Sequence, residues 1–429
     1  MNRREMLAGV GGVAAAAALN KLGSQMPSAE APIAPGIAPV GRAPEFPRKA
    51  DFRIDAGYTY INGAYTHPMP LVSAEAARKA ADGRSALVAP AAGRGGRGGG
   101  GGARPADPKA LFAKLINAKA SEISYIPNTS TGENLVVNGL GITKFDGNVV
   151  TDTLHFDGAL VHLLELQKQG LDLRVVKPRD YRIDIKDLEK VVDKKTKLIE
   201  ISLVTMYNGY QHDLKAVCDL AHANGALVYA DIVQAAGAVP IDVQAAGLDF
   251  AACSSFKWLM GDFGLGFVYA SEKAMERIHR SQWGYHSTSA MTGHFPPFDP
   301  EADKGSVSWT VSNNASGMFE VGSIGGSVQA SVTSSLEYIL SLGVENIQAH
   351  RQPLLKKMRE EIPRLGHTLV TPPESTSPII TFGTKDGAAV QKKLSAANVN
   401  ARVSTYWFRL SPSVYNDLHD IDRLLEALA

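Results

Sequence analysis

The sequence has few cysteines and almost no net charge, and both scarcities exclude classes of protein. Cys218 and Cys253 are its only cysteines among 429 residues. They stand in apolar surroundings without metal-ligand spacing, so we expect two buried free thiols rather than a disulfide or a metal site. Lysine and arginine together number 44, against 43 acidic residues, which leaves a net charge of +1. No basic excess therefore points to nucleic acid as a partner.

Long apolar runs are also scarce. The run Ala8–Leu19 is too short to span a bilayer comfortably. It follows Arg3-Arg4 and precedes a small-residue cleavage pattern, Ala-Glu-Ala, at residues 29–31. Paired arginines before such a run are typical of a twin-arginine export signal. The sequence therefore predicts a signal peptide at residues 1–31, a periplasmic or exported protein, and no membrane span after signal removal. An uncleaved N-terminus in a cytoplasmic protein is the alternative.

The rest of the chain divides by composition. Residues 32–58 are proline-rich and are interpreted as a linker or N-terminal arm. We expect a large domain at 59–330 and a small C-terminal domain at 331–429. The large domain contains a low-complexity glycine-rich insertion at 92–106, which cannot pack a core.

Helical and strand-like patterns alternate through the large domain. Apolar residues at helical spacing from Leu214 to Ala221 predict a helix that ends at Asn224-Gly225. Four runs with nearly continuous apolar character predict buried strands: LIEISLV (198–204), ALVYADIV (226–233), FAACSS (250–255) and GFVYAS (266–271). Strands that alternate with helices indicate an α/β fold with a mainly parallel sheet, whose ligands bind at the carboxyl ends of its strands.

The C-terminal region predicts a smaller α+β domain. Its expected elements are a helix at 345–362, a strand at 377–384, a short helix at 388–397, a strand-like run at 401–411 and a final helix with Ile421, Leu424, Leu425 and Leu428 on one face.

Two ionisable residues follow buried strands. Asp231 closes one strand, and Lys257 follows the next strand and two serines, 257 − 231 = 26 residues later. Pyridoxal phosphate chemistry needs such a pair: a lysine that forms a Schiff base, and a carboxylate that keeps the pyridine nitrogen protonated. The alternative is a helix-capping aspartate and an ordinary surface lysine. The apolar flanks of Lys257 in FKWLMG argue against that alternative, because burial lowers the pKa of a lysine as a Schiff base requires.

The wider constellation resembles the class V aminotransferase superfamily of fold-type I pyridoxal phosphate enzymes, in particular its isopenicillin N epimerase-like and cysteine desulfurase-like members. The motifs are Asp231, Gln234 three residues later, Ser254 and Lys257, followed by GDFGLGF. The similarity runs from about Tyr60 to the C-terminus. It implies a large domain with a mainly parallel sheet of seven-stranded type, a small C-terminal α+β domain, pyridoxal 5'-phosphate as cofactor and a homodimer.

The resemblance also implies a phosphate site. Ser130 and Thr131, at the start of the helix-like run 126–140, match the phosphate loop of the family, and Ser254 matches a second phosphate ligand. Backbone N–H groups and the dipole at a helix N-terminus favour an anion there. Ordinary helix capping is the alternative for the hydroxyl residues. Ser323 resembles a residue that reaches the phosphate of the partner subunit.

Four further roles follow from the resemblance. His155 stacks on the cofactor ring, with Phe156 as the alternative if the register slips by one. Gln234 donates to the ring oxygen, and Lys257 serves as acid and base at Cα. Arg409 holds the substrate carboxylate, for which a guanidinium fork is well suited. An arginine paired with a neighbouring acid is the alternative.

The reaction is predicted only as chemistry at the α-carbon of an amino acid through the Lys257 Schiff base, in the manner of an isopenicillin N epimerase or a transaminase. A C–S or C–Se lyase without a catalytic cysteine, and a non-catalytic exported protein that binds the cofactor, are the alternatives. Residues 401–407 contain no cysteine where desulfurases carry one, which argues against persulfide chemistry. Met206 stands where an asparagine often contacts the ring, with Asn208 nearby. No glycine fingerprint follows a strand, which argues against a nicotinamide-dependent oxidoreductase.

Overall fold

The computed structural model describes residues 44–86, 106–142, 146–302 and 305–429. They belong to one compact unit, Pro39–Ala429, of the two into which the chain divides. The predicted signal peptide, the first part of the predicted linker and residues 92–105 of the glycine-rich insertion lie outside the described residues. Among the residues that are described, no helix combines the length and the apolar character needed to cross a membrane.

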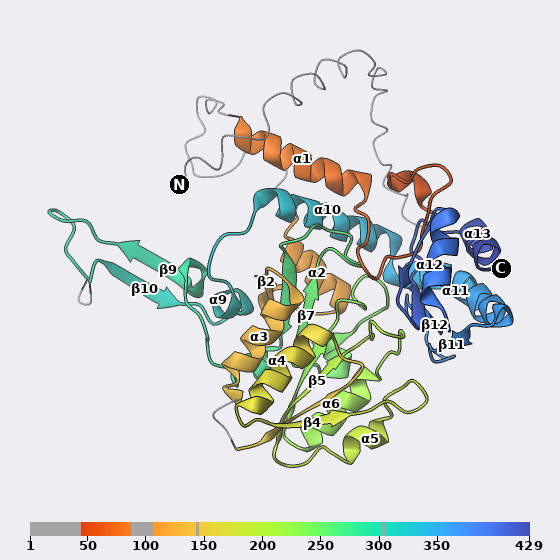
Figure 1. Ribbon diagram of the computed structural model, residues 1–429. Helices are drawn as coiled ribbons and strands as arrows, with labels where there is room; N and C mark the ends of the chain where they lie inside the picture. Colours follow the sequence, from red (N-terminus) through yellow and green to blue (C-terminus); the bar gives the residue numbers. More distant parts are fainter. Residues whose placement is uncertain (1–43, 87–105, 143–145, 303–304) are drawn as a thin grey trace, which may run out of the picture. The chain divides into compact units, whose positions relative to one another are not determined.

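A seven-stranded sheet forms the centre of the described unit, in the order β2-β8-β7-β6-β5-β3-β4 (Figure 1). Strands β3 to β7 run parallel, whereas β8 is antiparallel to its neighbours β7 and β2. The strands are β2 (Ile123–Ile126), β3 (Asn148–Asp152), β4 (Asp172–Val176), β5 (Thr196–Ser202), β6 (Leu227–Asp231), β7 (Phe250–Ser254) and β8 (Gly266–Ala270). The predicted α/β class and mainly parallel sheet are confirmed.

The two faces of the sheet pack against different helices. Alternate residues of β5 point to opposite faces. Leu198 belongs to a core cluster with residues of α3 (Thr129–Gly139) and α4 (Asp157–Lys168). Ile199 belongs to a second cluster, which includes residues of α6 (Leu214–Ala223). Glu200 and Ser202 follow at the spacing of Leu198 and so project toward α3 and α4.

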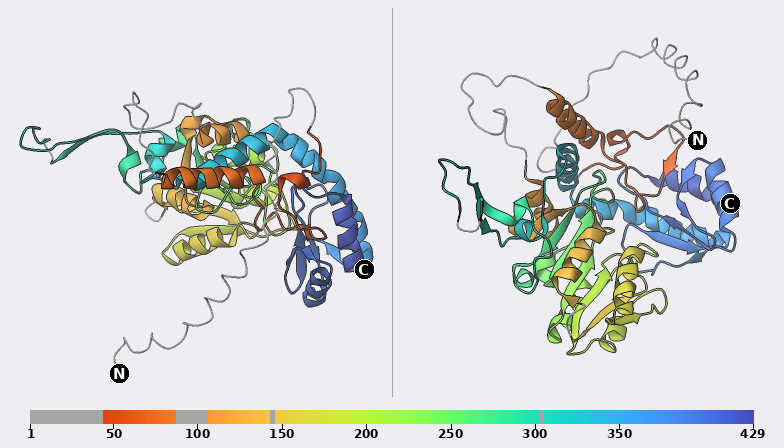
Figure 2. Two further views of the ribbon diagram at one scale, coloured as in Figure 1. Left: turned by 90° about the horizontal axis from the view of Figure 1, so that it is seen from above. Right: turned by 60° about the vertical axis from the view of Figure 1, so that its left-hand side comes forward.

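Other helices surround this core. Helix α1 packs along α10, as the views in Figure 2 also show. The bounds of these two helices and of the others in this region are α1 (Leu71–Ser85), α2 (Pro108–Ile116), α5 (Ile185–Glu189), α7 (Val243–Ala246), α8 (Glu272–Met275), α9 (Ala315–Phe319) and α10 (Gly326–Leu342). Helix α7 lies in the connection from β6 to β7, which allows these consecutive strands to run parallel.

The C-terminal region builds a second, antiparallel sheet in the order β11-β12-β15-β14. Helices α11, α12 and α13 share its apolar core. The elements are α11 (Val344–Glu361), β11 (Thr368–Leu369), β12 (Ile380–Gly383), α12 (Gly387–Ala396), β13 (Val399–Asn400), β14 (Arg402–Val403), β15 (Trp407–Leu410) and α13 (Leu418–Leu428). Strand β1 (Thr59–Tyr60) pairs with β13, which ties the start of the described chain to this region.

A two-stranded hairpin extends away from the rest of the unit (Figures 1 and 2). We call it the arm; it consists of β9 (Thr288–Gly293), β10 (Val307–Val311) and the described residues between them. Phe295 and Phe298 are 77% and 97% exposed, and Trp309 is also exposed. The aromatic stretch 281–298, for which pocket lining and surface location are both open from the sequence, thus lies largely at the surface.

Candidate active site

The carboxyl ends of the parallel strands meet at one edge of the central sheet. Asp152, Ser202, Asp231 and Ser254 are the last residues of β3, β5, β6 and β7. Ser202 and Asp231 are also register partners on adjacent strands. All four side chains are buried. This edge is where ligands of such sheets bind, and it gathers polar groups that a plain core would exclude.

Asp231 is the buried acid of this edge. Its Oδ1 accepts a hydrogen bond from the backbone N–H of Val233 at 2.8 Å. Burial raises the pKa of Asp231, and nearby His155, the Val233 N–H and Lys257 act in the opposite direction. A carboxylate with these neighbours is suited to bond a cationic ring nitrogen, because a positive charge in a buried site restores its ionised form.

Lys257 lies in the turn after β7. Burial lowers the pKa of its amine to about 8, against the attraction of Asp231, and the positive charge of Arg409 lowers it further. Across the part of the chain that the structure describes, Lys257 Nζ has no hydrogen-bond or ion-pair partner. The Phe256 ring lies 5.9 Å from it. An amine that is about half neutral at pH 8 and lacks a partner is available as a nucleophile.

Helix α3 begins at the same edge, because β2 runs in the direction of β7. Ser254 and Thr129 make reciprocal hydrogen bonds. Thr129 N–H donates to Ser254 Oγ at 2.9 Å, and Ser254 N–H donates to Thr129 Oγ1 at 2.9 Å. Ser130 and Thr131 follow in the first turn of α3, where Ser130 is exposed. The structure thus brings the three predicted phosphate residues to one helix N-terminus.

Gly132 allows α3 to approach the sheet. A Cβ atom there would lie 2.7 Å from Ile126 Cδ1 and 2.8 Å from Ala252 Cβ, distances that side chains do not tolerate. A larger residue would push the start of α3 away from the sheet edge. The glycine of the STGEN run therefore positions Ser130 and Thr131 relative to Ser254.

His155 lies between β3 and α4 and is fully buried. Its Nδ1 contacts Ser202 Oγ at 2.8 Å and its Nε2 contacts Glu200 Oε1 at 3.2 Å. Burial lowers its pKa, with Asp231 foremost among the groups acting in the opposite direction. The neighbouring Phe156 packs back against Gly158 at the start of α4. Of the two rings, His155 is therefore the one that interacts electrostatically with Asp231. Its stacking role stays a prediction.

Both the oxygen and the nitrogen of the Gln234 side-chain amide make hydrogen bonds. Its Oε1 accepts from Trp258 Nε1–H at 2.9 Å, and its Nε2 donates to the Ala64 carbonyl at 3.0 Å. Because an indole N–H can only donate, this contact fixes the orientation of the amide. One Nε2 hydrogen remains for the predicted bond to the cofactor ring.

Arg409 reaches the edge from β15 of the C-terminal sheet. Its Nη1 donates to the Met206 carbonyl at 2.6 Å, and its buried Nε has no partner among the described residues. Burial, and then Arg402, lower its pKa to about 10, so it stays charged at neutral pH. Asn208 does not replace the missing ring asparagine, since its amide bonds Thr205 and Tyr181 and stabilises the turn after β5.

The structure does not join Ser323 to the other candidates. It is exposed on the loop between α9 and α10, and no hydrogen bond connects it to another predicted site residue within the described ranges. The remaining predicted residues share the sheet edge or contact residues that do. The role of Ser323 across a dimer interface stays a prediction.

Sequence reasoning missed three polar residues of this region. Thr129 precedes the predicted pair Ser130-Thr131 and makes the direct contact with Ser254. Glu133 and Glu200 are buried acids on α3 and β5. Glu200 leaves a signal in the sequence, because a lone glutamate inside the apolar run LIEISLV is unusual in a central strand.

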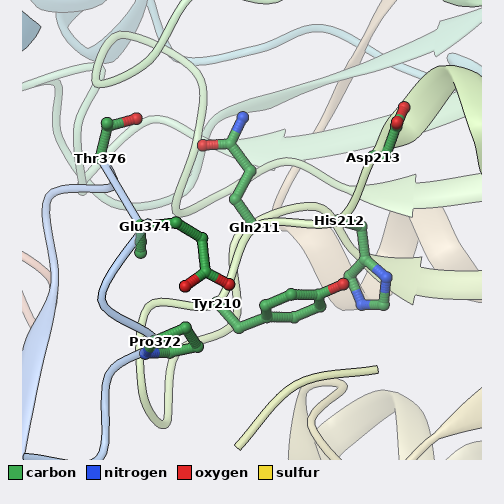
Figure 3. A pocket seen from close by; sticks show the side chains of 8 residues that line it. Tyr210, Gln211, His212, Asp213, Pro372, Glu374 and Thr376 are labelled. Atoms are coloured by element: carbon green, nitrogen blue, oxygen red, sulfur yellow. The ribbon is translucent and has the colours of Figure 1, made fainter. Parts of the chain in front are cut away.

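A separate hollow of about 260 Å³ lies between the turn after β5 and the loop before β12 (Figure 3). Its lining residues are Tyr210, Gln211, His212, Asp213, Pro372, Glu374, Ser375 and Thr376. None of the predicted site residues lines it. It contains no lysine and does not correspond to the candidate active site.

Fold and site together define a fold-type I architecture with a lysine and an aspartate at the sheet edge. The aminotransferase class-V family model matches residues 106–424. The chain therefore belongs to the aminotransferase class-V family, and the predicted family, enzyme class and pyridoxal phosphate cofactor are confirmed.

Individual relatives agree with this assignment. The chain is 31% identical over 251 residues to a probable cysteine desulfurase of Methanothermobacter thermautotrophicus, and the match covers 58% of each protein. It superimposes on the apo structure of a cysteine desulfurase from Thermococcus onnurineus with a TM-score of 0.75 at 20% identity, covering 90% of this chain and 97% of that one. A cystine C–S lyase in complex with cysteine persulfide gives a TM-score of 0.70 at 17% identity, with 87% and 97% covered. The two structures support the fold.

The residues at the sheet edge fit pyridoxal phosphate. The Lys257 amine has no competing partner, Asp231 is a buried carboxylate, and Arg409 retains an unpartnered Nε. Hydroxyl groups and backbone N–H groups at the start of α3 suit a phosphate. Lys257 and Asp231 would hold the aldehyde and ring-nitrogen ends, and Ser130, Thr131 and Ser254 the phosphate.

Proposed function

We propose that the chain removes a proton from Cα of an amino-acid substrate, with Lys257 as the group that carries this proton. The observation that carries the proposal is the partnerless Lys257 amine, whose pKa burial lowers to about 8, in electrostatic contact with both Asp231 and Arg409. A general base works best when its pKa lies near the working pH. A protein that only bound the cofactor would need neither the tuned amine nor the buried arginine.

Each side chain has a separate task. Pyridoxal phosphate, when bound, supplies the electron sink that acidifies Cα. Asp231 would accept a hydrogen bond from the ring nitrogen of the bound cofactor and keep that nitrogen protonated. Arg409 binds the substrate carboxylate through its free N–H groups and so orients Cα toward Lys257. Lys257 Nζ takes the Cα proton and returns one later in the reaction.

We favour elimination at Cβ, a C–S lyase reaction that uses no protein thiol, as the outcome of proton removal. The relatives named as cysteine desulfurases support reaction at a sulfur-bearing amino acid. Both cysteines of the chain are buried, and burial raises the pKa of each thiol. Neither is suited to accept sulfur as a thiolate. Elimination breaks the C–S bond and, after addition of water, releases pyruvate, ammonia and the thiol.

Epimerisation and transamination, which the sequence motifs favour, use the same groups. They differ from elimination in where the proton returns. Epimerisation would return a proton to the opposite face of Cα, and transamination would return none to Cα. These reactions form the second candidate function.

Product analysis separates the candidates. The purified holoenzyme is incubated with L-cystine, L-cysteine and a panel of L- and D-amino acids. Pyruvate with ammonia supports elimination, alanine with sulfane sulfur indicates desulfuration, and an inverted or deaminated product supports the second candidate. No turnover of any amino acid would contradict the proposal.

Lys257→Ala is the decisive variant for the mechanism. We expect turnover to fall by about 10³-fold or more, because both the covalent attachment and the proton carrier are lost. The visible absorbance of the lysine-bound cofactor disappears as well. The exposed Lys273→Ala, at the start of α8, is the matched control and should match the wild type.

A homodimer is the proposed assembly. An isolated two-stranded hairpin is marginally stable in water. The arm is such a hairpin, with exposed Phe295, Phe298 and Trp309, and a second copy of the chain would cover these rings. Sedimentation equilibrium over a range of protein concentrations tests this assembly.

Export remains a proposal that rests on Arg3-Arg4 and the apolar run after them. Replacement of both arginines by lysine should retain a tagged full-length chain in the cytoplasm, if the twin-arginine route carries it. Equal periplasmic recovery of both forms would contradict this route.

A further inference from the structure

Helix α11 carries a fully buried arginine whose charge has no task in the mechanism above. Arg351 is 0% exposed, and its Nη2 donates to the Ala238 carbonyl in the turn after β6. Among the described residues, no carboxylate pairs with Arg351, and its buried Nε and Nη1 have no hydrogen-bond partner. Burial lowers the pKa of Arg351 to about 9, so the side chain keeps its charge at neutral pH.

The charge of Arg351 opposes folding, because no negatively charged group among the described residues compensates it. Moving an ion from water into the interior costs free energy that an opposite charge nearby must offset. Arg351 acts electrostatically on His67 and His350, and burial together with Arg351 lowers the pKa of both. Neither histidine can supply a negative charge. A feature that opposes folding in this way is expected where it serves a function.

The guanidinium of Arg351 lies over the indole ring of Trp258. Its Cζ is 5.4 Å from the ring centroid, which is within the range of a cation–π interaction. Such an interaction is strongest where both groups are desolvated, and Trp258 is only 1% exposed. Trp258 follows Lys257 directly in the chain. Arg351 therefore contacts the residue next to the Schiff-base lysine.

Two glycines let other segments of the backbone approach Trp258 closely. Gly237, in the turn after β6, has a φ of +84°, and a Cβ atom there would lie 2.4 Å from the Trp258 carbonyl oxygen. A Cβ atom at Gly63 would lie 3.2 Å from Cη2 of the indole. The His67 ring completes the surroundings, 5.7 Å from the indole in an edge arrangement. The position of the indole therefore depends on contacts from several segments.

The N–H end of the same indole bonds the Gln234 amide. Trp258 Nε1 donates to Gln234 Oε1 at 2.9 Å, and Gln234 Nε2 donates to the Ala64 carbonyl at 3.0 Å. Gln234 and Ala238 belong to the same turn after β6, so Arg351 contacts both the turn that carries Gln234 and the ring that orients its amide. If the indole turned, Oε1 would lose its donor, and the amide could present its oxygen instead of an N–H to the cofactor ring.

We propose that Arg351 is a positioning residue for the cofactor ring, and that it acts through Trp258 on the Gln234 amide. The C-terminal region would thereby supply two arginines with different tasks. Arg409 binds the substrate carboxylate, whereas Arg351 touches neither substrate nor cofactor. The inference rests on the predicted bond between Gln234 and the cofactor ring oxygen, and it holds whichever reaction follows proton removal.

The first test uses the protein without cofactor, so its result is independent of the proposed reaction. Nitrogen NMR resolves the indole N–H groups of the four tryptophans, and loss of one signal in Trp258→Phe assigns that of Trp258. In Arg351→Met this N–H should exchange with solvent about tenfold faster than in the wild type, the effect of losing one desolvated cation–π contact. An unchanged exchange rate would overturn the proposal.

Arg359→Met is the matched control for Arg351→Met. Arg359 lies on the same helix, its Nη2 donates to the Ser375 carbonyl, and its buried Nε has no partner among the described residues. Within the same ranges it makes no hydrogen bond or cation–π contact with Trp258. The Trp258 signal and the cofactor affinity should therefore stay at wild-type values in this variant.

Cofactor affinity tests whether Arg351 acts through Gln234. Arg351→Met should weaken the binding of pyridoxal phosphate about tenfold, the cost of losing one hydrogen bond to a charged oxygen. Trp258→Phe keeps an aromatic ring but removes the N–H, so it should have a similar effect. In a Gln234→Ala background, Arg351→Met should cause no further loss, because the group that it positions is already absent. A further tenfold loss in that background would overturn the proposal.

The spectrum of the bound cofactor and the stability of the protein without it separate positioning from structural support. An N–H that bonds the ring oxygen stabilises its ionised form. The pH midpoint of the visible absorbance of the lysine-bound cofactor should therefore rise by about one unit in Arg351→Met. Without cofactor, Arg351→Met should resist urea at pH 7 at least as well as the wild type, because methionine removes a buried charge.

An unshifted midpoint would overturn the proposal, and lower stability without a shift would assign Arg351 to the fold alone. Arg351→Gln replaces Arg351→Met in all of these measurements if the methionine variant does not fold. Its amide can still donate to the Ala238 carbonyl, but it carries no charge over the indole.

Discussion

The edge of the central sheet buries charged side chains, whereas the arm exposes large apolar rings. At the sheet edge Asp231, Glu200 and Arg409 are buried; each side chain contacts a polar neighbour, whereas Glu200 Oε2 and Arg409 Nε have no partner among the described residues. On the arm Phe298 and Trp309 are exposed. Burying charge and exposing large apolar rings both oppose folding of a single chain. Such features are therefore retained where another molecule, a cofactor or a partner, completes the structure.

The difference between the two regions lies in how far the chain itself specifies the partner. The sheet edge presents an amine, a carboxylate, hydroxyls and a guanidinium, a set of groups that matches one cofactor and one substrate class. The arm presents rings that any apolar surface would cover. Substitutions at the edge should change chemistry, whereas substitutions on the arm should change association.

Asp231→Asn should have the largest effect among the variants that keep Lys257. The amide cannot hold the ring nitrogen in its protonated form, so we expect turnover to fall by about 10²- to 10³-fold, the usual cost of losing one electrostatic partner in a reaction site. Steady-state kinetics with the best substrate measure this loss. Asp242→Asn is the control, since Asp242 lies outside the candidate active site and caps α7, where asparagine caps equally well. Equal activity of the two variants would remove Asp231 from the mechanism.

Lys257→Met should stabilise the protein in the absence of cofactor. Burial lowers the pKa of Lys257 from 10.5 to about 8. Between these values the unfolded chain binds the proton that the folded chain has lost, so wild-type stability rises with pH through this window. Below pH 8 the buried charge costs about 3 kcal/mol, at 1.36 kcal/mol per pKa unit. Methionine avoids this cost.

Urea unfolding without cofactor at pH 7 and at pH 10.5 measures the expected gain. Lys257→Met should be more stable than the wild type at pH 7 and gain little at pH 10.5. A gain that is the same at both pH values would mean that lost charge is not its cause.

Arg409→Lys should raise KM by about 10- to 100-fold with a smaller change in kcat. A lysine keeps the charge but loses the fork that binds a carboxylate through two parallel bonds, and a charge-assisted hydrogen bond contributes about 1.5–3 kcal/mol. Arg402→Lys is the matched control, because Arg402 is the exposed register partner of Arg409. An equal rise in KM for both variants would show that the carboxylate is bound elsewhere.

The sequence predicts the sheet edge well because local patterns determine it. The predicted strand 226–233 contains β6, with Asp231 as its last residue, and the helix predicted to stop at Asn224 ends at Ala223. Apolar runs and helix-ending residues act within a few positions of the chain. The order of the strands and the family resemblance then place Asp231, Ser254 and Lys257 together.

Contacts that are distant in sequence explain where the prediction differs. The strand expected at 377–384 begins only at Ile380, because the hydroxyls of Ser375 and Ser377 bond the Gly209 carbonyl. The run 401–411 is interrupted by a turn in which Ser404 N–H donates to the Trp407 carbonyl. The contact between His155 and Glu200 likewise depends on how the turn after β3 packs against β5, which no local pattern encodes.

Phe298→Ser on the arm should have the smallest effect on the folded chain. Phe298 is 97% exposed, so its replacement should change the free energy of unfolding of a monomer by no more than about 0.5 kcal/mol. The same change should weaken self-association, since a ring covered by a second copy loses its apolar contact. Sedimentation equilibrium and urea unfolding measure the two effects separately.

Tyr406→Ser, which changes an exposed ring outside the arm, is the control and should alter neither association nor unfolding. Unchanged association in Phe298→Ser, Phe295→Ser and Trp309→Ser alike would show that a second copy does not cover the arm. The contrast with the sheet edge would then hold for chemistry alone.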